Sequence, residues 1–248
     1  MAADERPRGR WTIDDFCDNG MRDYPVGAKL LIWFVVIVLL AFSKLMWRWR
    51  MDGAERLKPA PGRKTGSVII CNHTSMAEVV AIYVHIWLSG RRCRPIAKSE
   101  FFDNGLVAWC FARAGAIPVD RGQADMAALR RAQRALKRGE DVLIFPEGTR
   151  IRTDDQPVTV HGGYALMAQM AKAPIAPMAV CGFRDITRPG SHLMRPVTCW
   201  MRAGDAFSLE DAPAGMKRRE RLAWAEAEGM RRVYEIRDGL RREHPGRR

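Results

Sequence analysis

The sequence predicts an α/β fold: a single domain with one mixed, largely parallel sheet flanked by helices, and an N-terminal hydrophobic helix that associates with a membrane. Two observations lead to this fold class. Apolar runs at 67–71 and 141–145 have the length of buried strands, and a polar loop follows each at once. Helix-length segments at 79–88, 124–137 and 163–171 alternate with the apolar runs, as in an α/β sheet.

Length and composition support a folded domain with an anionic partner. The 248 residues suffice for a well-buried α/β domain, and 47% hydrophobic with 28% charged residues is a globular balance. A net charge of +13 favours nucleic acid, an anionic membrane surface or phosphorylated substrates as partners. The basic residues are dispersed and form no aromatic-basic motif, so no nucleic-acid partner is predicted.

The six cysteines are scattered along the chain. None forms a C-x-x-C pair or pairs with a nearby histidine, so the spacing predicts neither a metal site nor a disulfide scaffold. This cysteine usage is typical of a reduced, cytosol-facing compartment.

Changes in composition divide the chain into four parts. We predict a polar N-terminal tail at 1–26, a membrane-associated hydrophobic helix at 27–50, a linker rich in Gly and Pro at 51–65, and a catalytic domain at 66–248. The catalytic domain ends in a basic amphipathic helix, from 216 to 243, which can pack on the domain or touch anionic headgroups or an acidic carrier protein.

The hydrophobic segment is too short for a simple membrane-crossing prediction. Residues 30–43 carry no charge, but a spanning helix needs about 20 apolar residues. The segment approaches that length only if it continues past Lys44, whose side chain must then snorkel to the membrane surface. A spanning helix, a helix in one leaflet and a buried core helix all remain open. The basic residues after the segment can bind anionic lipid, and they predict an inner (cytoplasmic) membrane location with the domain facing the cytoplasm.

The heptapeptide at 72–78 lies between a predicted strand and a predicted helix. Residues five apart on one helix point about 140° away from each other, so His73 and Glu78 can pair only if His73 precedes the helix. Ser75 and Glu78 fit a capping box that starts the helix there. A histidine held by a carboxylate is a candidate general base, although the same residues can also be a plain cap and a loop histidine.

A second polar loop follows the strand at 141–145. Its glycine turn exposes backbone N–H groups, Thr149 adds a hydroxyl, and Arg150 offers a planar fork suited to phosphate. Arg121 follows another short strand, at 115–119. We expect the two guanidinium groups to bracket a phosphate monoester beside the His73 base.

Four ordered blocks resemble those of a known family. The sequence from 66 to 210 resembles the glycerolipid acyltransferases, particularly the bacterial lysophosphatidic acid acyltransferases. The blocks are Asn72-His73-x4-Glu78, the segment 115–121 that ends in Arg121, Phe145-Pro146-Glu147-Gly148-Thr149-Arg150, and residues 173–177.

The resemblance implies a role for each matching residue. His73 is then the base and Glu78 its partner, residues 174–177 shape the donor side, and acyl-CoA or acyl-carrier protein is a co-substrate without a cofactor. The substrate-binding residues are Asn72, Arg121, Glu147, Gly148, Thr149 and Arg150. Two positions depart from the family: Glu78 stands where Asp is usual, and His161-Gly162-Gly163 stands where a Lys-Gly pair is common, so a basic contact there is expected to be weaker or absent. His161 is expected to be a surface or loop histidine.

The expected activity is acyl transfer to the free hydroxyl of lysophosphatidic acid, giving phosphatidic acid for phospholipid biosynthesis. No Gly-x-Ser-x-Gly elbow is present, which argues against a serine nucleophile. Another lysolipid acceptor, such as a lyso-ornithine lipid, and a non-enzymatic membrane-binding protein remain alternatives. A phosphate-ester hydrolase is disfavoured because metal-ligand spacing is lacking.

Overall fold

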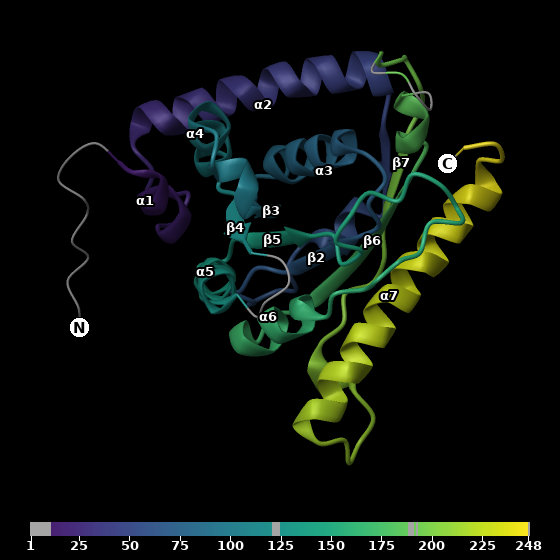
Figure 1. The fold of residues 1–248 in the computed structure, drawn as a ribbon. Helices are drawn as coiled ribbons and strands as arrows, with labels where there is room; N and C mark the ends of the chain where they lie inside the picture. Colours follow the sequence, from purple (N-terminus) through teal and green to yellow (C-terminus); the bar gives the residue numbers. More distant parts are fainter. Residues whose placement is uncertain (1–10, 121–124, 188–190, 192, 248) are drawn as a thin grey trace.

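A mixed sheet forms the centre of the computed structural model, which describes residues 11–120, 125–187, 191 and 193–247 (Figure 1). Its strand order is β1-β7-β6-β2-β5-β3-β4. Neighbouring strands pair in parallel except β6 and β7, which are antiparallel. The strands are β1 (Arg50–Asp52), β2 (Val68–Cys71), β3 (Cys93–Lys98), β4 (Ile117–Val119), β5 (Asp141–Ile144), β6 (Ile175–Cys181) and β7 (Trp200–Ala203).

Helices cover both faces of this sheet. In Figure 1, α2, α3 and α4 lie on one side of the strands, and α5, α6 and α7 lie on the other. The α-helices are α1 (Ile13–Asp18), α2 (Val26–Trp47), α3 (Met76–Leu88), α4 (Gly105–Arg113), α5 (Met126–Lys137), α6 (Gly163–Ala171) and α7 (Arg218–Glu243). Short 3-10 turns are η1 (Ala54–Leu57), η2 (Ser99–Phe102), η3 (Phe183–Ile186) and η4 (Leu209–Asp211). The predicted α/β fold class is confirmed.

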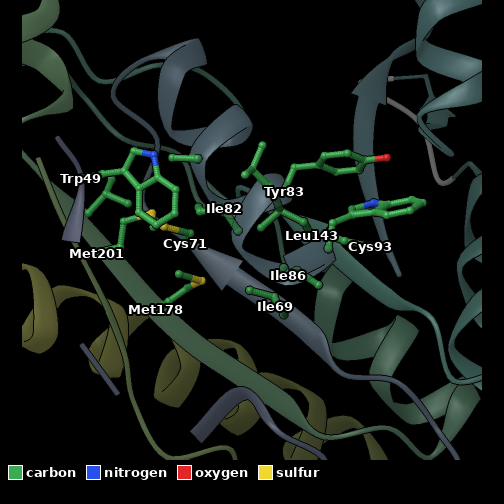
Figure 2. Close-up of a cluster of buried hydrophobic side chains, with 14 of the residues drawn as sticks. Trp49, Ile69, Cys71, Ile82, Tyr83, Ile86, Cys93, Leu143, Met178 and Met201 are labelled. Carbon is green, nitrogen blue, oxygen red and sulfur yellow. The ribbon is translucent and has the colours of Figure 1, made fainter. Parts of the chain in front are cut away.

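Strand β2 is buried along its whole length because it is covered on both faces. Its side chains alternate, as a strand requires: Ile69 and Cys71 join the core under α3, whereas Val68 and Ile70 join the core under α5, α6 and α7. Figure 2 shows the first of these cores, in which Ile82 of α3 packs over the sheet. This double burial explains why the strand reads as a continuous apolar run rather than an alternating one.

Helix α2 packs along α3 instead of standing away from the domain. Ile32 and Val36 are buried, and the ring of Trp33 meets that of Trp87 on α3 at 5.5 Å. The opposite side of α2 is apolar and exposed, with large side chains at Leu30, Phe34, Ile37, Val38, Phe42 and Leu45. By length and composition, α2 could cross a membrane, yet one side of it is a wall of the domain.

The predicted polar N-terminal tail contains α1 and a small aromatic cluster. From Trp11 onward it is folded: Trp11, Phe16 and Tyr24 make mutual ring contacts, and Phe16 and Tyr24 are buried. The fully buried Arg94 of β3 donates to the main-chain carbonyl of Phe16 and pairs with Glu140 at 2.6 Å. Trp11, Phe16 and Tyr24 supply the apolar surface that packs this segment on the domain, although the sequence around them is polar.

The predicted linker also contains regular structure. Its first residues belong to β1, which pairs with β7 at the edge of the sheet, and η1 follows with Leu57 buried. A three-residue edge strand carries no sequence period of its own, so only its pairing with β7 reveals it.

Candidate active site

The two polar loops lie side by side at one edge of the sheet. β2 and β5 are parallel neighbours, so their carboxyl ends bring His73 and the loop 145–150 together. Helix α3 begins at Met76 with Ser75 as its N-cap, and the predicted capping box between Ser75 and Glu78 is present. His73 therefore precedes the helix, as the pairing with Glu78 requires.

His73 and Glu78 form a hydrogen-bonded pair, which we call the His73–Glu78 pair. Nδ1 of His73 lies 2.7 Å from Oε1 of Glu78, whose side chain is completely buried. Oε1 also accepts the Thr74 N–H at 2.5 Å, while Oε2 accepts the Thr74 hydroxyl and the Ser75 N–H, each at 2.8 Å. Glu is thus long enough to cap the helix and to reach the imidazole at the same time.

The loop after β5 holds the main chain of His73. The His73 N–H donates to Oε2 of Glu147 at 2.7 Å, and the His73 carbonyl accepts the Ile151 N–H at 2.7 Å. The ring of Phe145 stacks on the imidazole, with centroids 4.3 Å apart. Glu147 is only 4% exposed, and burial raises the pKa of its carboxyl. Its surroundings are those of a residue that positions His73 rather than of a substrate ligand.

Asn72 has a similar place inside the protein. Its side-chain oxygen accepts the Val180 N–H at 2.9 Å, and its side-chain nitrogen donates to the Val180 carbonyl at 3.2 Å. Asn72 is 2% exposed, so it ties the end of β2 to β6 just before His73. The resemblance predicted substrate contact, whereas the structure uses both polar groups of Asn72 within the fold.

The glycine turn does not present all the N–H groups that were expected. The N–H of Gly148 donates to the Phe145 carbonyl, and that of Thr149 donates to the Glu147 carbonyl, so both are used within the loop. Gly148 has a φ of 65°, which favours glycine. A Cβ there would meet the His161 ring at 2.7 Å. The turn is therefore a close-packing point rather than a ready donor site.

The predicted phosphate contacts are only partly visible. Thr149 and Arg150 are exposed beside Gly148. Arg121 lies outside the described residues, so the expected pair of guanidinium groups stays a prediction. The segment 174–177 is not at this edge of the sheet: the Pro174 carbonyl accepts the N–H of Val68, at the amino end of β2. Because β6 runs parallel to β2, this block lies at the opposite strand end from His73.

A large apolar cavity opens beside His73. Its volume is about 820 Å³, and it extends from α2, α3 and α4 past the carboxyl ends of the central strands to α5 and α6. The side chain of His73 is 12% exposed and lines it together with Gly148. Much of the wall is aliphatic, with Leu31, Val35 and Leu39 from α2 and Met76, Val79 and Val80 from α3. Such a cavity suits a hydrocarbon chain that ends at the imidazole.

Two residues near the site were not predicted. His161, expected to be a loop histidine, lines the same cavity, and its ring packs against Gly148. An imidazole there can donate a hydrogen bond to an oxyanion or a phosphate. Tyr234, on α7, lies near Glu147 and lowers the pKa of its carboxyl, against the larger effect of burial. The family resemblance marked position 161 as the place of a common Lys-Gly pair, whereas no local pattern marks Tyr234, which comes near the site from a distant segment.

No metal site accompanies these residues in the part of the chain that the structure describes, where no three His, Cys, Asp or Glu side chains are grouped to hold an ion. The cavity is lined mainly by apolar side chains, and His73, which Glu78 holds at Nδ1, lines it as well. This arrangement can move a proton at the mouth of an apolar pocket.

Comparisons with known proteins agree with this geometry. A family model described as "Acyltransferase" matches residues 48–181. The 1-acyl-sn-glycerol-3-phosphate acyltransferase of Bacillus subtilis is 30% identical over 176 residues, which are 71% of this chain and 83% of that protein. The human 1-acyl-sn-glycerol-3-phosphate acyltransferase alpha is 32% identical over 193 residues, 73% of this chain and 64% of that protein.

The likeness extends to a relative in plants and to a solved structure. The Cocos nucifera 1-acyl-sn-glycerol-3-phosphate acyltransferase is 27% identical over 67% of this chain, which spans only 54% of that protein. The crystal structure of the 1-acyl-sn-glycerophosphate (LPA) acyltransferase PlsC from Thermotoga maritima matches with a TM-score of 0.61 at 20% sequence identity. The match covers 82% of this chain and 80% of the Thermotoga chain. At that identity, the solved structure supports the fold.

Proposed function

This chain belongs to the acyltransferase family and is an O-acyltransferase, and we propose that its acceptor is lysophosphatidic acid. The product would be phosphatidic acid, and the donor would be acyl-CoA or acyl-carrier protein. The observation that carries the proposal is the His73–Glu78 pair at the mouth of the apolar cavity. The names of the relatives support this choice of acceptor.

The proposed reaction begins with proton removal by His73. Because Nδ1 is occupied by Glu78, Nε2 is the nitrogen that takes the proton from the free hydroxyl of the acceptor. The buried carboxylate stabilises the imidazolium that forms. The main-chain contacts to Glu147 and Ile151 keep the ring in place beside the cavity.

Acyl transfer then completes without a covalent acyl-enzyme. The acceptor oxygen attacks the thioester carbonyl carbon, the carbon–sulfur bond breaks, and the imidazolium gives its proton to the departing thiolate. His73 is thereby returned to its neutral form. No cofactor is needed in this scheme, since the donor thioester supplies the activated acyl group.

The apolar cavity is the proposed site of a fatty acyl chain. Aliphatic residues of α2 and α3 line it, and it reaches His73, where the reacting carbonyl must lie. Burying a CH₂ group is worth about 0.8 kcal/mol, so an acyl chain gains substantial binding energy there. The walls have few polar side chains, which keeps water away from the thioester.

The acceptor's phosphate is proposed to bind on the opposite, polar side of His73. Arg150 is exposed there, directly after the loop that holds His73, and a guanidinium suits a phosphate monoester. Arg121, together with Thr149, is proposed to complete the contact. This part of the proposal rests on residue chemistry and on the family resemblance.

The exposed apolar side of α2 indicates membrane association, which brings the enzyme to an acceptor that resides in a bilayer. We propose that α2 lies in one leaflet, because its other side packs along α3 and lines the cavity. The exposed cations Arg48, Arg50, Arg56 and Lys58 follow it and can bind anionic headgroups. With these cations inside, the domain would face the cytoplasm at the inner membrane.

A thiol-release assay tests the proposed function. The full chain, purified in detergent, is given acyl-CoA or acyl-carrier protein with either lysophosphatidic acid or a lysolipid without the phosphate. We expect thiol release that requires the phosphorylated acceptor and is lost in His73→Ala. The matched control is His244→Ala, because the His244 ring stacks on Trp200 and does not line the cavity.

The outcomes separate the alternatives. Equal release with the phosphate-free acceptor would favour another lysolipid as substrate. Undiminished release in His73→Ala would overturn the mechanism. A wild-type chain that binds membranes but releases no thiol with any donor would favour a non-enzymatic role.

A further inference from the structure

A buried arginine holds the loop at residues 150–156, which we call the Arg150 loop. Arg184 lies on η3, just after β6, and is buried. Its Nη1 donates to the main-chain carbonyl of Arg152 at 3.0 Å, and its Nη2 donates to Oδ1 of Asp154 at 2.7 Å. One guanidinium thus binds the Arg150 loop through a main-chain oxygen and a side-chain oxygen at the same time.

Arg150, the proposed phosphate contact, is the first residue of this loop. The side chain of Gln156, the last residue, donates to the Arg150 carbonyl at 3.1 Å and accepts the Arg152 N–H at 2.9 Å. The two ends of the loop are therefore hydrogen-bonded to each other. Because Arg184 bonds residues between these ends, it fixes the loop as a unit, including the main chain from which the Arg150 side chain projects.

The Arg150 loop also contacts the proposed base. The N–H of Ile151 donates to the His73 carbonyl at 2.7 Å. Strand β2 pairs in parallel with both β5 and β6, so His73, the Arg150 loop and Arg184 all follow the carboxyl ends of neighbouring strands. Arg184 joins the segment after β6 to the loop after β5.

Asp154 also receives an arginine from α7. Nη2 of Arg241 donates to the same Oδ1 at 3.2 Å, and in Figure 1 the loop runs beside this part of the helix. The side chain of Asp154 is 66% exposed, whereas that of Arg184 is 8% exposed. The Arg184 hydrogen bond lowers the pKa of Asp154 against a smaller effect of burial, so this carboxylate carries its charge at neutral pH.

We propose that Arg184 is a positioning residue for acceptor binding: it holds the Arg150 loop in the conformation that directs Arg150 toward the acceptor's phosphate. The inference rests on the proposed function, since it takes Arg150 as the phosphate contact. Arg184 does not line the cavity, so its effect is on the acceptor rather than on the acyl chain. A planar guanidinium can bind a carbonyl and a carboxylate together, which the point charge of a lysine does less well.

Asp154→Ala tests the proposal at the exposed end of the contact, where the core is not opened. By Coulomb's law alone, removal of a carboxylate near an anion site tightens the binding of an anionic substrate. The proposal predicts the opposite sign. The KM for lysophosphatidic acid should rise about threefold, a modest change because the carboxylate is partly exposed to solvent. Both kcat and the KM for the acyl donor should stay unchanged, because only binding of the acceptor is weakened.

Asp155→Ala is the matched control for charge. Asp155 is the next residue of the Arg150 loop and is also exposed, but the arginines of η3 and α7 contact Asp154 instead. We expect the acceptor KM of Asp155→Ala to stay at or below the wild-type value. The proposal is overturned if Asp154→Ala does not raise the acceptor KM, or if Asp155→Ala raises it equally.

Limited proteolysis measures the loop without substrate. Trypsin cleaves after arginine, and Arg150 and Arg152 are both exposed. Arg184→Lys keeps the charge but loses the planar fork. Cleavage after these two arginines should become about threefold faster or more, since its rate follows the population of the open loop.

Arg195→Lys is the control for the same change of side chain. Arg195 donates to the Asp185 carbonyl at 2.8 Å, outside the Arg150 loop, so this variant should be cleaved in the loop at the wild-type rate. Equal cleavage of Arg184→Lys and the wild type would overturn the proposal. Faster cleavage of Arg184→Lys together with absence of acyl transfer by the wild type would count only against the proposed function.

Discussion

Oε1 of Glu78 lies 2.7 Å from Nδ1 of His73 while the same carboxylate closes the capping box at the start of α3. The helix start and the candidate catalytic pair are therefore a single structural unit. Thr74 strengthens it, because its N–H and its hydroxyl both donate to Glu78. A carboxylate with this many donors is fixed in orientation, which is what a partner of a general base requires.

Replacing Glu78 by Gln should reduce kcat by about 10² or more, which is the order of a general base's contribution. The amide keeps the size of the side chain but removes the charge that stabilises the imidazolium. The thiol-release assay measures the effect, and circular dichroism checks that α3 is intact. A kcat within threefold of the wild type would contradict the assigned role of Glu78.

Replacing Arg150 by Ala should weaken the binding of the phosphorylated acceptor. A hydrogen bond to a charged group contributes about 1.5–3 kcal/mol, so the KM for lysophosphatidic acid should rise about tenfold or more. The KM for the acyl donor should be unchanged. Arg130→Ala, on the exposed side of α5, is the control for the lost charge. An equal rise in the KM for the acyl donor would argue against a phosphate contact.

Filling the cavity should shorten the acyl chain that the enzyme accepts. Val80 lines the cavity from α3, and Val80→Phe adds volume where we expect methylene groups. At about 0.8 kcal/mol per CH₂, loss of two contacts lowers kcat/KM for long donors about tenfold. A series of saturated acyl donors measures this shift. Leu88→Phe, at the exposed end of α3, should leave the chain-length profile unchanged.

Charges on the outer side of α2 should detach the protein from membranes. Phe34 and Ile37 are exposed and apolar, and in the double variant Phe34→Glu/Ile37→Glu vesicle binding should fall about tenfold or more. Flotation with anionic vesicles measures binding, and Phe34→Leu/Ile37→Leu is the control. Unchanged flotation of the Glu variant would show that this side of α2 does not contact lipid.

The raised pKa of Asp141 should lower the free energy of unfolding as the pH rises through the weakly acidic range. Burial raises its pKa from the ordinary 3.8 to about 6, although Arg91 and the Ser67 N–H lower it. The folded state therefore holds the proton more tightly than the unfolded state, and this contribution is present below pH 3.8 and lost as the pH rises through about 6.

The comparison of the wild type with Asp141→Asn isolates this contribution. At 1.36 kcal/mol per pKa unit, the variant should gain roughly 2 kcal/mol of unfolding free energy relative to the wild type between pH 4 and pH 7. The lost ion pair with Arg91 lowers the variant's stability at neutral pH, so the change in the difference with pH is the quantity to measure. Denaturant unfolding at both pH values does so, and a constant difference would contradict the raised pKa.

Local sequence patterns predicted the parts of the fold that depend on neighbouring residues. The segment at 163–171 is a helix with these bounds, and the capping box correctly placed the start of α3. Edge elements were harder: β1 (Arg50–Asp52) lies where the hydrophobic helix was predicted to meet the linker, and its pairing with β7 defines it. Short edge strands follow their partners rather than a period of their own.

The sequence by itself determined the α/β class and the His73–Glu78 pair, because a pattern of a few residues places both partners of that pair. Only the tertiary structure decided that Asn72 bonds Val180, 108 residues away, and that Glu147 holds His73 from 74 residues away. It also decided that α2 lines the cavity. Buried polar groups must find partners, but the fold alone decides which distant groups come within hydrogen-bond distance.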